Sequence, residues 1–244
     1  MKPAHALLAA VLLSAAPAAL AAPGPIEIAV ADPSRPAEDK ARDADRKPAE
    51  MLAFAGVKPG MTVIDLMPGG GYFSRLFADV VGPKGKVIGL VPEEMMKFPN
   101  AAERLKAVSA GHDNIEVKAV PLLNLPIKGT ADVVWTSQNY HDLHNTPNLD
   151  LVAFNKQVFA ALKPGGVYVV LDHAAAAGTD IGSTNTVHRI DPAIVKREVL
   201  AAGFVFDGES KVLYNPADDH TQNVHSGAIR GHTDQFIYRF RKAK

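Results

Sequence analysis

Cysteine is absent from all 244 residues of this sequence, and tryptophan occurs only once. Without thiols the chain has no disulfides, no thiolate metal ligands and no cysteine that a lipid can modify. An excess of charge is missing too, because 26 Lys and Arg residues balance 26 Asp and Glu residues. A neutral chain has no overall field that attracts nucleic acid or an anionic membrane. The composition therefore predicts a globular protein with no nucleic-acid partner.

The most apolar stretch lies at the N-terminus and has the layout of a secretory signal peptide. Lys2 supplies the positive start, residues 6–13 the apolar centre, and Ala19-Leu20-Ala21 a small-residue cleavage site. This stretch is short for a transmembrane helix, and Pro17 interrupts it. We expect a signal peptide over 1–22, a periplasmic or secreted location, and no membrane span after cleavage. The alternative is a buried N-terminal helix.

The rest of the chain shows alternating strand and helix patterns. Proline-rich sequence without periodicity predicts a flexible segment at 23–40, and residues 41–244 are long enough for one domain. Strands are expected at 61–66, 86–91, 115–120, 131–137, 167–171, 211–214 and 235–240. Helices are expected at 35–54, 72–81, 93–110 with a break at Pro99, 149–162 and 191–200. This order predicts an α/β doubly wound sheet with its ligand crevice at the carboxyl ends of the strands. The last two strands are expected to pair antiparallel.

A glycine-rich turn follows the first predicted strand. The β-branched run reaches Asp65, breaks at Met67-Pro68-Gly69-Gly70-Gly71 and restarts at Tyr72 as an amphipathic helix pattern. Glycines let the backbone approach a ligand closely, and the helix N-terminus offers free N–H donors. The turn lacks the lysine of a P-loop and the Gly-x-Gly-x-x-Gly spacing. It resembles motif I of the class I S-adenosylmethionine-dependent methyltransferases, although a tight turn without a ligand is an alternative.

Later segments extend this resemblance in the family's order. They include Leu162-Lys163-Pro164-Gly165-Gly166 before the fifth strand and Ala201–Phe204 at a helix end. The chain as a whole also resembles a bacterial branch of exported predicted methyltransferases. This resemblance implies a Rossmann-like seven-stranded sheet with an antiparallel last strand, in a single domain, and S-adenosylmethionine as cofactor. The residues it implies for cofactor binding are Asp65, Met67, Pro68, Gly69, Gly70, Gly71, Tyr72, Glu93, Asn124 and Asn139.

Two positions depart from the family pattern. Members of the family usually hold the cofactor ribose with an acid at the end of strand two, where this chain has Leu90. A second acid, after strand three, usually contacts the adenine amino group, and Pro121 falls near its place. We expect Glu93 or Glu94 to reach the ribose, or else to face solvent. Asn124 is expected to contact the adenine through its amide oxygen.

Polar side chains follow the fourth and fifth strands. His141 is suited to act as a general base at neutral pH, with Asp142 orienting it or sharing the task. His173 is a second acid–base group or a substrate contact, and His188 with Arg189 a candidate for binding an anion. The structural alternatives are helix capping by His141 and Asp142 and backbone hydrogen bonding by His173.

We therefore expect methyl transfer from S-adenosylmethionine to a small molecule, with His141, Asp142 and His173 as catalytic residues. No compact motif such as His-Glu-x-x-His occurs, so no metal is expected, although five residues supply enough ligand atoms: His141, Asp142, His144, His173 and His188. One alternative is an exported protein of this fold that binds ligands or assists other proteins without methyl transfer. Another is an acid–base or metal-dependent enzyme in the same crevice. The long loop 215–235 is a candidate lid.

Overall fold

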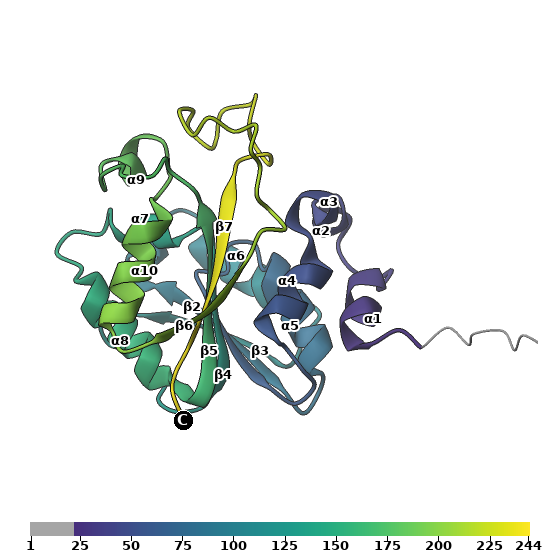
Figure 1. Cartoon of the computed structure of the whole chain (residues 1–244). Coiled ribbons are helices and arrows are strands. Elements are labelled where there is room, and N and C mark those ends of the chain that lie inside the picture. Colours follow the sequence, from purple (N-terminus) through teal and green to yellow (C-terminus); the bar gives the residue numbers. More distant parts are fainter. Residues whose placement is uncertain (1–21) are drawn as a thin grey trace, which may run out of the picture.

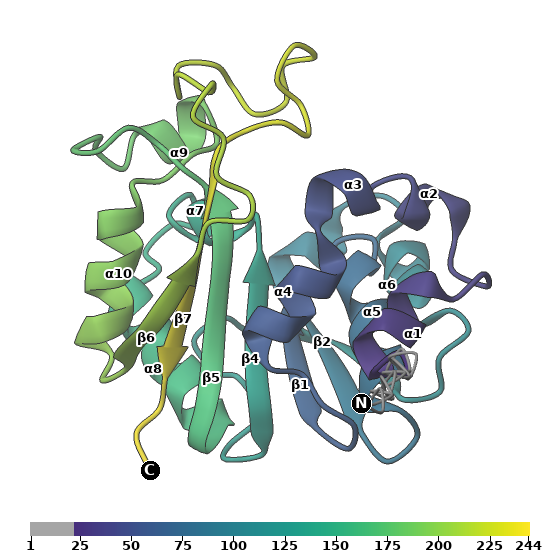
Figure 2. The ribbon, with the colours of Figure 1, turned by 45° about the vertical axis from the view of Figure 1, so that its right-hand side comes forward.

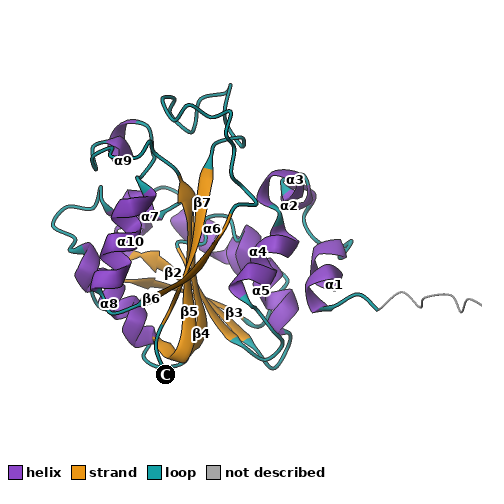
Figure 3. Cartoon of the chain, in the orientation of Figure 1, coloured by secondary structure: helices purple, strands orange, loops and turns teal. Residues whose placement is uncertain are grey.

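A computed structural model describes residues 22–244, so the expected signal peptide lies outside the described residues except for its last position. A seven-stranded sheet with the order β3-β2-β1-β4-β5-β7-β6 forms the centre. Helices cover both of its faces (Figures 1 and 3). The parallel strands are β1 (Thr62–Leu66), β2 (Lys86–Pro92), β3 (Ile115–Val120), β4 (Ala131–Ser137) and β5 (Leu162–His173); β7 (Gln235–Arg241) runs antiparallel to both β5 and β6 (Val205–Ser210). The predicted α/β class and doubly wound sheet with an antiparallel last strand are confirmed.

Alternating side chains of the central strands build a core on each face of the sheet. Ile64 of β1 faces the core beneath α8 (Leu151–Ala161) and α10 (Pro192–Ala201). Its neighbour Val63 faces the opposite core, beneath α4 (Pro48–Ala55) and α5 (Tyr72–Val81). On that side Trp135 is fully buried, and its ring centroid lies 4.8 Å from that of Phe73. Strands buried on both faces explain the near-continuous apolar runs of the sequence.

The N-terminal segment differs from the expected flexible stretch. It contains α1 (Pro25–Ala31) and α2 (Ala37–Lys40), followed by α3 (Asp43–Arg46). Helix α1 packs against α4 and α5, and Asp39 forms a buried ion pair with Arg75 of α5 at 2.6 Å. The predicted helix over 35–54 is divided because Lys47 adopts a left-handed φ of 47° immediately before Pro48. Ala29 of α1 packs into the core, whereas α2 is attached through the Asp39–Arg75 ion pair, which leaves no periodic pattern in the sequence.

Two other predicted elements differ from those of the structure. The predicted strand 211–214 is wrong, since the chain forms β6 at Val205–Ser210 and turns after it. A bulge between Phe206 and Gly208 breaks the alternation that would have revealed β6. The predicted helix over 93–110 is divided at Pro99 as expected, but the part before the proline is a 3₁₀ helix, η1 (Glu93–Lys97), and the part after it is α6 (Ala101–Ser109).

The carboxyl ends of the parallel strands meet along one edge of the sheet. The short helices α7 (Tyr140–Leu143) and α9 (Ser183–Thr186) lie there, as does the long loop before β7, which is yellow in Figure 2. Helices α2 and α3 reach the same edge from the other side (Figure 2). Segments distant in sequence therefore surround one crevice. Within residues 22–244, no helix has the length and apolar character needed to cross a bilayer.

Candidate functional site

The glycine-rich turn leaves β1 at the crevice edge. Met67 takes a left-handed φ of 54°, and its N–H donates to the carbonyl of Leu90 at 2.7 Å. The N–H of Gly71 then donates to the carbonyl of Pro68 at 2.9 Å, which closes the turn before α5. The first and last glycines both have positive φ, 57° at Gly69 and 83° at Gly71. The turn therefore needs residues that tolerate left-handed backbone.

The glycines serve two different purposes. A Cβ added to Gly71 would lie 2.8 Å from the Cα of Val108, so the close approach of α6 requires a glycine there. A Cβ added to Gly69 or Gly70 meets no atom within 4 Å, and Gly70 has no positive φ. Gly70 is thus not required by packing or by backbone conformation. Its missing side chain leaves space directly above the turn.

Asp65 lies beneath this turn and is almost completely buried. It accepts a hydrogen bond from the Ser74 hydroxyl at 2.5 Å. Burial raises the pKa of Asp65 to about 7, against the opposing effects of that hydrogen bond and of the Arg46 charge. The carboxylate therefore ties the end of β1 to the first turn of α5.

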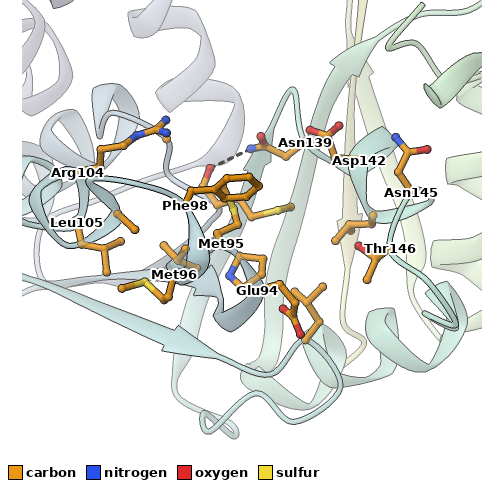
Figure 4. Close-up of a pocket in the computed structure, with 17 residues that line it drawn as sticks. Glu94, Met95, Met96, Phe98, Arg104, Leu105, Asn139, Asp142, Asn145 and Thr146 are labelled. Carbon is orange, nitrogen blue, oxygen red and sulfur yellow. Dashed lines mark hydrogen bonds between the residues drawn. The ribbon is translucent and has the colours of Figure 1, made fainter. Parts of the chain in front are cut away.

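Two adjoining cavities lie on either side of the turn. The larger, about 550 Å³, is bounded by η1 and α6 and by the segment that follows β4 (Figure 4). The smaller, about 190 Å³, lies over the turn itself. Asn139 lines both cavities and donates from its side-chain amide to the carbonyl of Met67 at 3.0 Å. The predicted residues lining the small cavity are Asp65, Met67, Pro68, Gly69, Gly70, Tyr72 and Asn139.

Two arginines that the sequence analysis missed cover the small cavity. Arg42 and Arg46 line it, and the Arg46 guanidinium lies 4.9 Å from the centre of the Tyr72 ring. Burial and the neighbouring Arg42 charge lower the pKa of Arg46 to about 10, so it stays protonated at neutral pH. Paired guanidinium groups suit a carboxylate. The sequence around them is rich in charge, and nothing in it indicates that α3 lies over β1.

The cofactor residues expected after strands two and three require two corrections. Strand β2 continues past Leu90 to Pro92, and the helical turn that follows places Glu94 in the lining of the large cavity. Glu93 faces solvent outside that lining. Asn124 is likewise exposed, because the turn after Pro121 directs Leu122 into the cavity in its place. Glu94, one of the two acids expected at the ribose, thus lines the cavity, and Leu122 lines it where Asn124 was expected.

His141 is oriented by Asp172, not by Asp142 as expected. Its Nδ1 donates to Asp172 Oδ1 at 2.8 Å, and its backbone N–H donates to Oδ2 at 2.7 Å. Burial lowers the pKa of His141, but the Asp172 charge and hydrogen bond outweigh it, so the pKa lies above its usual value. Burial alone would raise the pKa of Asp172, but the charge and hydrogen bond of His141 outweigh burial and hold that pKa below its usual range. The pair is a fixed histidine–carboxylate dyad.

The other predicted polar residues lie in different surroundings. Asp142 lines the large cavity, and its Oδ1 lies 3.3 Å from His141 Nε2. His173 lines a third cavity of about 540 Å³, and its Nδ1 lies 2.7 Å from the Thr233 hydroxyl. Burial lowers the pKa of His173 to about 4, so its ring is neutral at pH 7. His144 is directed away, toward Glu198.

Arg189 does not bind an anion in the crevice as expected. It is fully buried and forms a two-bond ion pair with Asp218, of 2.7 and 3.1 Å. Asp218 also accepts the backbone N–H of Asp234. This pair attaches the loop over 215–235 to the base of the crevice.

The residues that line the two cavities suit S-adenosylmethionine in their chemistry. The large cavity presents Met95, Met96 and Phe98, which suit a purine ring, and the carboxylate of Glu94, which suits a diol. The small cavity presents an open glycine turn and two guanidinium groups, which suit an amino-acid end. The order of the strands and this site define the class: a class I methyltransferase fold with its ligand crevice at the carboxyl ends of the strands.

Comparison with known proteins agrees with that class. A family model described as "Methyltransferase domain" matches residues 57–208, and this chain belongs to that family. A solved S-adenosylmethionine-dependent methyltransferase from Aquifex aeolicus superposes with a TM-score of 0.57 at 19% identity, covering 87% of this chain and 99% of that one. The likeness to that structure is one of fold.

Curated relatives match smaller parts of the chain. A demethylmenaquinone methyltransferase of Lactococcus lactis is 34% identical over 126 residues, which are 51% of this chain and 46% of the relative. The ribosomal RNA large subunit methyltransferase E of Nitrobacter winogradskyi is 29% identical over 167 residues, 61% of this chain and 70% of the relative. The match thus spans less than half of the L. lactis protein's length.

Proposed function

We propose that this protein is an S-adenosylmethionine-dependent methyltransferase that acts on a small molecule. The observation that carries the proposal is the pair of adjoining cavities, one apolar and one polar, that share Met67, Gly69 and Asn139. S-adenosylmethionine has an apolar base at one end and a charged amino-acid group at the other, joined through a ribose. These two ends match the apolar and the polar cavity. Family membership over residues 57–208 supports it.

The residues of the chain divide the binding work by chemistry. Met95, Met96 and Phe98 would hold the adenine in the apolar cavity, and Glu94 would accept hydrogen bonds from the ribose hydroxyls. The guanidinium groups of Arg42 and Arg46 would bind the carboxylate of the methionine end. When bound, S-adenosylmethionine supplies an electrophilic methyl group.

The third cavity is the proposed site of the methyl acceptor. It shares Arg42, Arg46 and Gln138 with the cavity over the glycine turn, and His173 lies in its wall. Because the pKa of His173 is lowered to about 4, its ring is neutral at pH 7 and would contact the acceptor by hydrogen bonding. Holding the acceptor against the neighbouring cavity would contribute to the rate through proximity.

A small acceptor agrees better with this chain than RNA does. The formal net charge is zero, whereas binding an RNA backbone depends on a surplus of basic groups. One relative is named for demethylmenaquinone and another for ribosomal RNA, so the names alone do not decide. We further propose export, on the basis of the sequence over 1–22, and N-terminal sequencing of the protein from a periplasmic fraction tests it.

Calorimetric titration with S-adenosylmethionine and S-adenosylhomocysteine tests the proposed cofactor. We expect one binding site with low-micromolar affinity for both compounds. Adenosine, which lacks the amino-acid end, is expected to bind more weakly because it leaves Arg42 and Arg46 without a partner. The absence of heat with either compound, in protein that unfolds cooperatively, would overturn the proposal in favour of a non-enzymatic protein of this fold.

A further inference from the structure

Three side chains with metal-binding atoms converge beside the crevice. His141 and Asp142 come from α7, and His188 comes from the loop after α9. Their ligand atoms all lie within 4.8 Å of one another. We propose that His141 Nε2, Asp142 Oδ1 and His188 Nδ1 bind one divalent transition-metal ion of the Zn²⁺ type. Binding of an ion here requires neither the proposed cofactor nor methyl transfer, although Asp142 also lines the large cavity.

The separations between the ligand atoms match metal coordination. Two ligands at about 2.0–2.1 Å from a tetrahedral Zn²⁺ ion lie about 3.4 Å apart. His141 Nε2 lies 3.3 Å from Asp142 Oδ1, and His188 Nδ1 lies 3.8 Å from the same oxygen. A charge-assisted hydrogen bond would be shorter, about 2.7–2.9 Å. Two of the three separations are thus close to those of ligands around a common centre, and the third, between the two histidine nitrogens, is no more than 4.8 Å, so side-chain rotation can bring all three atoms to one ion.

Asp172 holds His141 in the state that a metal requires. Because its carboxylate accepts the Nδ1 proton, the lone pair of Nε2 is directed toward Asp142 and His188. A carboxylate behind a histidine ligand is the usual outer partner of a protein metal site, where it fixes the tautomer and raises the basicity of the ligand. Asp172 is fully buried and accepts three hydrogen bonds, from His141 N, His141 Nδ1 and His173 N.

The position of His188 is fixed by the two residues that follow it. Its neighbour Arg189 is locked in the buried ion pair with Asp218, and Ile190 forms a bridge with Ala174 at the end of β5. These contacts hold the His188 ring against the ring of His141, with 5.6 Å between centroids. The third ligand therefore needs no folding of its loop before it binds.

Two nitrogens and one carboxylate oxygen leave a coordination position open. The side chain of Asp142 is 48% exposed and lines the large cavity, so an ion there is reachable from the crevice. Imidazole and carboxylate are the ligands of Zn²⁺ sites that keep a fourth position for water or substrate. A chain without cysteine has only such nitrogen and oxygen ligands.

Equilibrium dialysis of the tag-free protein, stripped with a chelator and titrated with ZnCl₂, tests the proposal. We expect one Zn²⁺ per chain for the unmodified protein. His188→Asn removes one ligand while keeping a residue that tolerates the left-handed φ of 55° at this position. We expect the Zn²⁺ affinity of His188→Asn to fall by more than the roughly 10- to 100-fold that is typical when a residue hydrogen-bonded to a metal ligand is lost. Asp142→Asn is expected to weaken binding as well.

His232→Asn is the matched control, because His232 is exposed on the loop before β7 and away from the three ligands. It should bind one Zn²⁺ with unchanged affinity. Substitution with Co²⁺ gives a second readout, since the visible absorption typical of a tetrahedral site should disappear in His188→Asn. The proposal fails if the unmodified protein binds no stoichiometric metal, or if His188→Asn, with an unchanged unfolding midpoint, binds as tightly as the control.

Discussion

Glu93 and Glu94 are adjacent acids in different environments, and they provide a matched pair for the ribose contact. Glu94 lines the large cavity, whereas Glu93 faces solvent. We predict that Glu94→Gln weakens S-adenosylhomocysteine binding about tenfold, or roughly 1.4 kcal/mol, because a charged acceptor becomes neutral. Glu93→Gln should leave the dissociation constant unchanged. Equal effects in a calorimetric titration would reject the assignment of Glu94.

Asp65 makes stability depend on pH in a predictable direction. Its folded-state pKa is raised to about 7, whereas an unfolded aspartate titrates near the ordinary value of 3.8. Between these values the folded state binds the proton more tightly, so stability falls as pH rises from about 4 to about 7. We predict that Asp65→Asn removes this part of the pH dependence. Urea unfolding at several pH values measures it, and parallel profiles for the two proteins would contradict the prediction.

At the scale of the element, the ion pair between α2 and α5 attaches the N-terminal helices to the domain. Asp39 and Arg75 are both nearly buried, and Arg75 also donates to the carbonyl of Gly70 in the glycine turn. We predict that Asp39→Ala lowers the free energy of unfolding by about 3–5 kcal/mol, because it leaves a buried guanidinium unpaired. Exposed Glu38 on the same helix is the control, and Glu38→Ala should have no measurable effect in urea. Similar losses for both variants would show that the pair does not anchor α2.

The elements also show which features the sequence was able to predict. Apolar runs such as that of β4 predicted the sheet, because strands buried on both faces leave a strong local pattern. The α2–α5 attachment left no such pattern, since it depends on single charged residues far apart in the chain.

The sequence predicted only that part of the site whose residues are adjacent in the chain. The glycine turn is contiguous in sequence, so its residues were found together. Asp172 accepts a hydrogen bond from His141, 31 positions away in the sequence, and Arg46 donates one to Gln138, 92 positions away. Only the fold reveals these contacts. The sequence left Glu93 and Glu94 as alternatives for the ribose contact, and only the fold shows that Glu94 is the one that lines the cavity.

At the scale of the whole molecule, the Arg189–Asp218 pair joins the loop over 215–235 to the crevice. Both side chains are completely buried. We predict that Arg189→Met lowers the free energy of unfolding by about 3–5 kcal/mol and exposes this loop to limited proteolysis. Arg197→Met, an exposed change on α10, is the control. If a protease leaves the loop of Arg189→Met as intact as the loop of the control, the ion pair does not attach the loop to the crevice.

The central claim is that the space above the glycine turn holds the amino-acid end of S-adenosylmethionine. Gly70→Ala tests it most directly, because a Cβ there meets no protein atom within 4 Å and the backbone is not left-handed. The decisive measurement is the dissociation constant of S-adenosylmethionine for Gly70→Ala and for the unmodified protein. We predict more than tenfold weaker binding by Gly70→Ala, with an unchanged free energy of unfolding. Equal affinity of the two proteins would contradict it.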